Sequence, residues 1–218
     1  MPEILTEIEA RILGSLVEKQ LTTPEYYPLT LNALVNACNQ KNNREPVVSY
    51  GEKAVGDTLE ILRDRNLVYV FYGSTSRVPK YKHMLPSVYE LDEPATAIVS
   101  ELLLRGPQTL GELRGHCERL HAFASLGEVQ ETLDSLMRRD DPLVVRLPVQ
   151  PGRKEARFAH LLFGAIDIEA LAAAPVTRAS RTAIDAERIE KLEEEVTGLR
   201  TEVDGLKQTF EEFKKQFE

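Results

Sequence analysis

The hydrophobic positions of residues 1–86 follow a helical period three times and then alternate. The helical stripes are Ile8, Ile12, Leu13, Leu16 and Val17, then Leu31, Leu34, Val35 and Cys38, then Val55, Leu59 and Leu62. Thr6-x-x-Glu9 and Ser49-x-x-Glu52 have the pattern of capping boxes, which predicts the starts of the first and third helices. The segments LVYVFYG and RVPKYKHML follow, on either side of a turn rich in Gly and Ser. This order predicts three helices and a β-hairpin.

The same order of residues returns further along the chain. Equivalent pairs are Ile12 and Ile98, Thr30 and Thr109, Leu34 and Leu113, Cys38 and Cys117, Leu59 and Leu133, Tyr81 and Phe158, and His83 and His160. In the second copy Asp92 is a predicted N-cap, and Thr109-x-x-Glu112 and Ser125-x-x-Glu128 repeat the capping pattern. The chain is therefore predicted to hold two copies of one module of roughly 80 residues.

Three helices followed by a β-hairpin are typical of the winged helix, a variant of the helix-turn-helix. We therefore predict a mainly α fold with small β-hairpins, of the α+β class. It comprises two tandem winged-helix domains, the first over residues 1–86 and the second over residues 87–165.

The remaining residues predict a linker and a coiled coil. Residues 166–182 are rich in Ala, Thr, Ser and Pro, and residues 183–218 carry heptads with β-branched residues at a and Leu at d. This choice of residues favours a parallel homodimer. The predicted dimer interface comprises Ile189, Leu192, Val196, Leu199, Val203, Leu206 and Phe210. The alternative is a single amphipathic helix that folds back on the two modules.

The net charge of −8 argues against a protein that coats nucleic acid nonspecifically. The charge is uneven, however, because residues 1–86 carry ten basic and ten acidic side chains and residues 166–218 carry eight and thirteen. No signal peptide is recognisable, and the longest apolar run is interrupted by Glu101 and too short to span a bilayer. We therefore expect a cytoplasmic protein that has no membrane segment.

One polar stretch, CNQKNNREP at residues 38–46, belongs to the first copy alone. The offset between the copies falls from 79 to 74 across it, so the first copy has five additional residues before its third helix. In helix-turn-helix proteins this turn lies against DNA, and Asn, Gln and Arg side chains can pair with base edges. The same residue types are also common in ordinary loops.

The predicted DNA contacts therefore come from this turn and from the basic wings. They are Asn39, Gln40, Lys41, Asn43, Arg44, Lys53, Arg77, Lys80, Lys82, Arg146, Arg153, Lys154 and Arg157. The alternative for the wings is a solvated edge strand protected by charge. The third helices are predicted to pack rather than to read DNA, because their exposed positions are mostly acidic.

Several residues suggest chemistry but are better explained by the core. His116, Cys117 and His121 could form a metal site, yet Cys117 repeats Cys38 on a buried helical face. No nucleophile elbow, P-loop or dinucleotide-binding glycine pattern is present. We therefore expect no catalytic residue, metal or cofactor, and the protein is not predicted to be an enzyme.

The stretches VEKQLTTPEYYPLTLNALVNACNQKNNREPV and LLLRGPQTLGELRGH resemble signature segments of the YceH family of uncharacterised bacterial proteins. The resemblance extends over most of residues 4–166. It implies a pair of winged-helix domains and brings no activity or ligand with it.

Two functions remain open. The first is a dimeric DNA-binding protein, a possible transcriptional regulator, whose wings and 39–45 turn contact double-stranded DNA. The second is a non-enzymatic adaptor whose winged-helix domains dock a protein partner. The pI of about 5.2 favours the adaptor, and the basic wings favour DNA.

Overall fold

The computed structural model describes residues 4–72, 78–149 and 153–164, all within one compact unit. The predicted linker, the predicted coiled coil with its dimer interface and the wing residue Arg77 lie outside these residues.

The first copy contains three α-helices and a three-stranded antiparallel sheet. Its elements are α1 (Glu7–Thr22), the short 3₁₀ helix η1 (Pro24–Tyr26), β1 (Leu29–Thr30), α2 (Leu31–Cys38), α3 (Glu52–Asp64), β2 (Val68–Phe71) and β3 (Lys80–His83). The strands are ordered β1-β3-β2, and Val70 lies opposite Tyr81. A short helix, α4 (Leu85–Tyr89), leads into the second copy.

The second copy repeats this order on a smaller sheet. Its elements are α5 (Glu93–Arg105), α6 (Leu110–Cys117), α7 (Leu126–Met137), β4 (Val144–Arg146) and β5 (Phe158–His160). Gln108 forms an isolated bridge to Phe158, in the place where the first copy has β1. The α+β composition expected from the sequence is confirmed.

The helix starts follow the predicted caps with one exception. Thr6 and Thr109 form complete capping boxes with Glu9 and Glu112. The box predicted at Ser49 is wrong, because α3 begins at Glu52 and its N-cap, Gly51, makes no side-chain bond. Glu52 is thus the first helical residue, whereas a capping box needs it in the third position.

The equivalent positions of the two copies have the same burial. Four of the predicted pairs are almost completely inaccessible in both copies, namely Ile12 and Ile98, Leu34 and Leu113, Cys38 and Cys117, and Leu59 and Leu133. The repeated apolar positions therefore serve the same purpose in both copies, and their side chains belong to one continuous hydrophobic cluster.

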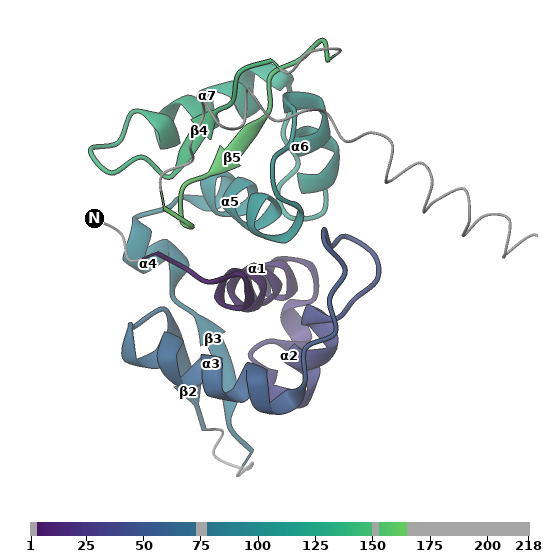
Figure 1. Cartoon of the computed structure of the whole chain (residues 1–218), viewed down its shortest axis with the longest axis vertical. Helices are drawn as coiled ribbons and strands as arrows, with labels where there is room; N and C mark the ends of the chain where they lie inside the picture. The colour runs from purple at the N-terminus through teal and green to yellow at the C-terminus, as the bar shows by residue number, and fades with distance from the viewer. Residues whose placement is uncertain (1–3, 73–77, 150–152, 165–218) are drawn as a thin grey trace, which may run out of the picture. The chain divides into compact units, whose positions relative to one another are not determined.

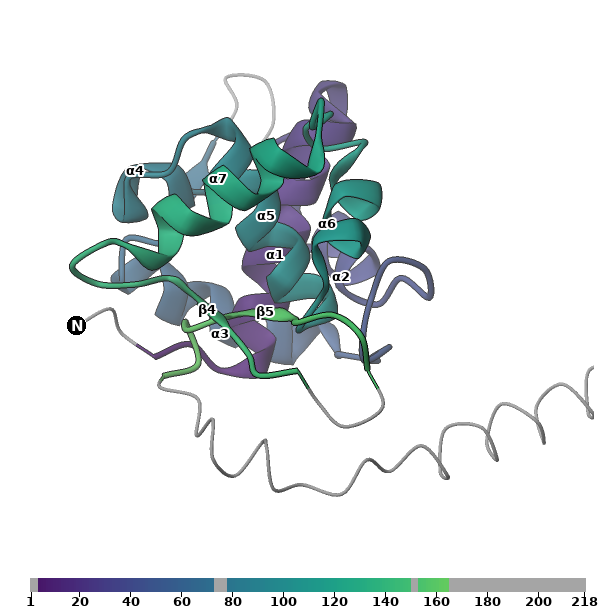
Figure 2. The same ribbon diagram turned by 90° about the horizontal axis from the view of Figure 1, so that it is seen from above.

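The copies pack together through their first helices. Helices α1 and α5 lie side by side between the two sheets, which are at opposite ends of the unit (Figure 1). Figure 2, seen from above, shows α5 lying over α1. The Ser100 hydroxyl on α5 donates to the Gly14 carbonyl on α1 at 3.2 Å. Gly14 and Ser100 are separated by 86 residues, which is the offset of this part of the repeat. Contact between equivalent positions is what an approximate two-fold axis produces.

Candidate functional site

The additional residues of the first copy form a loop that is fixed to the protein. Thirteen residues (39–51) separate α2 from α3, whereas eight (118–125) separate α6 from α7, so the five-residue difference predicted from the offsets is confirmed. The amide of Glu45 donates to the carbonyl of Leu104 on α5 at 2.9 Å, and Arg105 donates to the side chain of Asn43. The loop therefore connects the first copy to the second.

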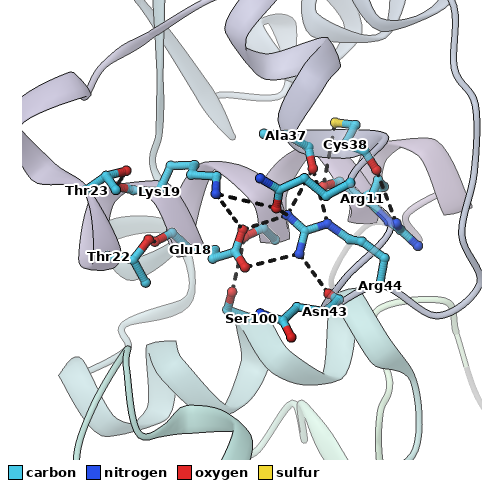
Figure 3. Close-up of polar contacts among 12 residues, drawn as sticks. Arg11, Glu18, Lys19, Thr22, Thr23, Ala37, Cys38, Asn43, Arg44 and Ser100 are labelled. Atoms are coloured by element: carbon cyan, nitrogen blue, oxygen red, sulfur yellow. Dashed lines mark hydrogen bonds and ion pairs between the residues drawn. The ribbon is translucent and has the colours of Figure 1, made fainter. Parts of the chain in front are cut away.

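Arg44 is the centre of this loop, and its side chain is fully buried (Figure 3). Its guanidinium donates to both carboxylate oxygens of Glu18, at 3.1 and 2.6 Å, and to the carbonyl of Ala37 at 2.9 and 3.2 Å. It also donates to Oε1 of Gln40 and to the carbonyl of Asn43. Burial alone would raise the pKa of Glu18, but Arg44 and Lys19 outweigh it and hold that pKa below its usual value.

This position corrects the prediction that Arg44 contacts DNA. A guanidinium has five N–H donors, and here they are directed at one carboxylate and at oxygens of the loop itself. If Arg44 left Glu18 to bind a phosphate, the Glu18 carboxylate would stay buried without a counter-charge, which is strongly unfavourable.

Other side chains of the loop also have internal partners. The Asn39 amide donates to the carbonyl of Tyr50 at 2.8 Å and accepts from its N–H at 2.7 Å, which closes the loop. Oε1 of Gln40 accepts from Lys19 at 3.4 Å. Lys41 is exposed. The loop therefore has a structural role, and Lys41 is the one cation of the 39–45 turn that the structure leaves on the surface.

The first sheet has an exposed face on which aromatic side chains of β2 lie beside lysines of β3. Tyr69 and Phe71 on β2 lie opposite Lys82 and Lys80 on β3, so the four side chains share one face. The two aromatic residues are 58% and 46% exposed. No carboxylate among the described residues lies within ion-pair distance of either lysine. We call these four residues the aromatic–lysine face.

The sequence predicted the lysines of this face but missed the aromatic residues. The signal was present in the VYVF of LVYVFYG, where aliphatic and aromatic residues alternate. On a strand this pattern places Tyr69 and Phe71 on the side opposite the core.

The second hairpin differs. Arg157 donates to Glu112 at 2.8 Å and to the carbonyl of Pro107, so its charge is used inside the second copy. The predicted residues Arg146, Arg153 and Lys154 are exposed.

The third helices carry excess negative charge, as expected. α3 has four acidic and two basic residues, and both cations pair with carboxylates: Lys53 with Asp57 at 2.6 Å, and Arg63 with Glu60 and Asp64. α7 has three acidic residues and no basic one. Neither helix presents an unpaired cation to a phosphate.

The repeated histidines and cysteines are buried at equivalent positions of the two copies. Burial lowers the pKa of His83 and of His160 to about 4, so both imidazoles are neutral at pH 7. Burial raises the pKa of Cys38 to about 11 and raises that of Cys117 as well. Within residues 4–72, 78–149 and 153–164, no three His, Cys, Asp or Glu side chains are grouped as metal ligands.

Comparison with known proteins places this chain in a family. A family model described as "Protein of unknown function, DUF480" matches residues 5–153. The chain belongs to the DUF480 family. Among its relatives, a UPF0502 protein of Geotalea uraniireducens is 52% identical over 216 residues, which is 98% of each chain.

Two further relatives of this DUF480 chain bear the same name. A UPF0502 protein of Geobacter sulfurreducens is 51% identical over 220 residues and covers both chains in full. One of Opitutus terrae is 53% identical over 173 residues, 79% of this chain and 75% of its own length. The expected family of uncharacterised bacterial proteins is confirmed, whereas the YceH name stays a prediction. Within the described part of the DUF480 chain, no helix is sufficiently long and apolar to cross a membrane.

Proposed function

We propose that this DUF480 protein is a pair of tandem winged-helix domains that binds double-stranded DNA through the first wing. The observation that carries the proposal is the aromatic–lysine face of β2 and β3. Lys80 and Lys82 have no carboxylate partner among the described residues, and each lies opposite an exposed aromatic side chain. Lysines without a counter-charge supply the phosphate contacts that dominate DNA affinity.

The proposed mode is led by the hairpin, not by the third helix. Helix α3 would bring four carboxylates toward the phosphates, and its Lys53 and Arg63 already have acidic partners. The one cation that the 39–45 turn can contribute is Lys41, because Arg44 is buried. Arg146, Arg153 and Lys154 of the second wing are candidates for additional phosphate contacts.

A second candidate function, a protein-docking adaptor, is favoured by the same acidic helices. Exposed Tyr69 and Phe71 are also residue types enriched in protein interfaces. The two candidates differ in their response to salt, because a phosphate-led complex weakens steeply as salt concentration rises.

We further propose that the chain forms a homodimer through the heptads of residues 183–218. The support is the a/d pattern of the sequence, which favours two parallel strands. Truncation after residue 182 is then expected to leave a folded monomer, whereas the full chain is a dimer. Light scattering on both proteins measures this, and a dimeric truncated protein would place the interface in the modules instead.

The experiment that tests DNA binding is fluorescence anisotropy of the full chain with a random duplex, at about 50 and 200 mM salt. We expect binding in the micromolar range or tighter at the lower salt, with a steep loss at the higher. Absence of binding at low salt would favour the adaptor.

A further inference from the structure

A polar cleft of about 350 Å³ lies at the junction of the two copies. One wall is formed by the end of α1 and residues 40–43 of the loop, and the other by α5, α6 and the residues just after α6. Its volume is at the lower end of the range for small-molecule sites. Unlike most such sites it is lined mainly by polar side chains, which selects a hydrophilic ligand.

The charges around the cleft favour an anion. Lys19, Lys41 and Arg119 line it together with the carboxylates of Glu18 and Glu101. Each carboxylate has an arginine partner outside the lining, Glu18 in Arg44 and Glu101 in Arg105 at 3.0 Å. Five cations therefore surround two carboxylates, in a chain whose net charge is −8.

Two of these cations are available to a ligand. Lys41 and Arg119 are exposed, and neither has an ion-pair or hydrogen-bond partner among the residues that the structure describes. They come from opposite walls, Lys41 from the loop of the first copy and Arg119 from the segment after α6. Arginine and lysine are the side chains that bind phosphate groups.

The remaining lining suits sugar hydroxyls. Oε1 of Gln40 and Oδ1 of Asn43 accept from internal cations, which leaves their amide N–H groups free to donate, and Asn42 makes no internal bond in the described part of the chain. The hydroxyls of Thr22 and Thr23 donate to main-chain carbonyls and keep lone pairs that can accept.

His116 adds a further acceptor. Its Nδ1 bonds to Oε1 of Gln108, whose amide nitrogen donates to main-chain carbonyls, so Nδ1 carries the hydrogen. Burial and the charge of Arg105 lower the pKa of His116, which favours the neutral ring with Nε2 as an acceptor. Among the described residues that line the cleft there is no Phe, Tyr or Trp side chain.

We propose that this cleft binds a small sugar phosphate, with the phosphate held between Lys41 and Arg119 and the hydroxyls bonded by the surrounding amides, hydroxyls and imidazole. The ligand would connect the two copies, because its contacts come from both. This inference does not depend on DNA binding, and its test does not involve DNA.

Isothermal titration of the full chain with ribose 5-phosphate tests the proposal, with ribose and inorganic phosphate as comparison ligands at matched ionic strength. We expect one saturable site for ribose 5-phosphate, and weaker binding of either half alone. The double variant Lys41→Gln/Arg119→Gln should weaken binding about tenfold or more, because bonds between ions are the strong ones. Both residues are exposed, so the unfolding midpoint should not change.

The matched control is Arg146→Gln/Lys154→Gln, which removes the same charge from exposed positions that do not line the cleft. It should bind ribose 5-phosphate as the unaltered chain does. Three results would overturn the proposal: no saturable binding at millimolar ligand, equal weakening in both double variants, or equally tight binding of inorganic phosphate or ribose alone.

Discussion

The two copies share a core but differ at the connection between their second and third helices. In the second copy eight residues (118–125) join α6 to α7, whereas in the first copy thirteen residues (39–51) join α2 to α3. The longer loop places Arg44 in a buried ion pair with Glu18 and reaches α5 of the other copy. The buried positions of the two copies thus stay equivalent, and the asymmetry between the copies is found where they meet.

The two hairpins show the same contrast, with equivalent buried residues and different surface charges. Tyr81 and Phe158 fill equivalent buried positions, yet the basic residues beside them differ in their use. Lys80 and Lys82 have no carboxylate near them among the described residues, whereas Arg157 is bonded to Glu112. The first hairpin therefore has charge available for a ligand, and the second uses one of its arginines internally.

The largest expected effect is on the loop that is peculiar to the first copy. Arg44→Ala removes the counter-charge of buried Glu18, and we expect the free energy of unfolding to fall by about 3–5 kcal/mol. Urea denaturation at pH 7 measures it. Lys53→Ala is the control, since it breaks an exposed pair of α3 and should cost far less. A loss below about 1 kcal/mol for Arg44→Ala would show that the loop does not depend on this pair.

A second prediction tests the equivalence of the copies through His83 and His160. The folded-state pKa of each is about 4, below the ordinary value of 6.5, so the unfolded chain binds more protons between these values. The stability that each neutral imidazole provides is therefore complete above pH 6.5 and is lost as the pH falls toward 4. The loss should reach about 3 kcal/mol for each residue.

His83→Phe and His160→Phe should each reduce the dependence of stability on pH between 4 and 6.5, and by similar amounts. Urea unfolding of both variants and the unaltered chain across this range measures the slopes. A reduced slope in one variant and not in the other would show that the equivalent histidines do not have equivalent surroundings.

A smaller effect is expected where the copies touch. A Cβ on Gly14 would lie 2.8 Å from Cγ of Leu104 and 3.3 Å from Cβ of Leu103. Gly14→Ala should therefore destabilise by about 1–3 kcal/mol through crowding, partly offset by about 1 kcal/mol of helix propensity. Gly56→Ala on α3, whose Cβ would have its nearest neighbour at 3.7 Å, should stabilise instead. Equal shifts in the unfolding midpoint would mean that the α1–α5 contact tolerates a methyl group.

Much of this fold could be predicted from the sequence because its signals are local or repeated. Helical spacing and the caps at Thr6 and Thr109 depend on residues three or four positions apart, and the repeat identified His83 and His160 as equivalent core residues. The role of Arg44 could not be predicted, because its partner Glu18 is 26 residues away and the burial of both depends on packing between segments. The Ser49 box failed for a related reason: Asn39 fixes Tyr50, and the helix begins after that bond.

DNA binding led by the first hairpin is the central claim, and the salt dependence of duplex affinity in two double variants tests it most directly. Lys80→Gln/Lys82→Gln should weaken binding and reduce the slope of log affinity against log salt by about 2, since each phosphate contact contributes roughly 0.9. Lys53→Gln/Arg63→Gln, which removes the paired cations of α3, should leave the slope unchanged. The account would be contradicted if the slope fell in the α3 variant and not in the hairpin variant. It would also be contradicted if the unaltered chain did not bind the duplex at low salt.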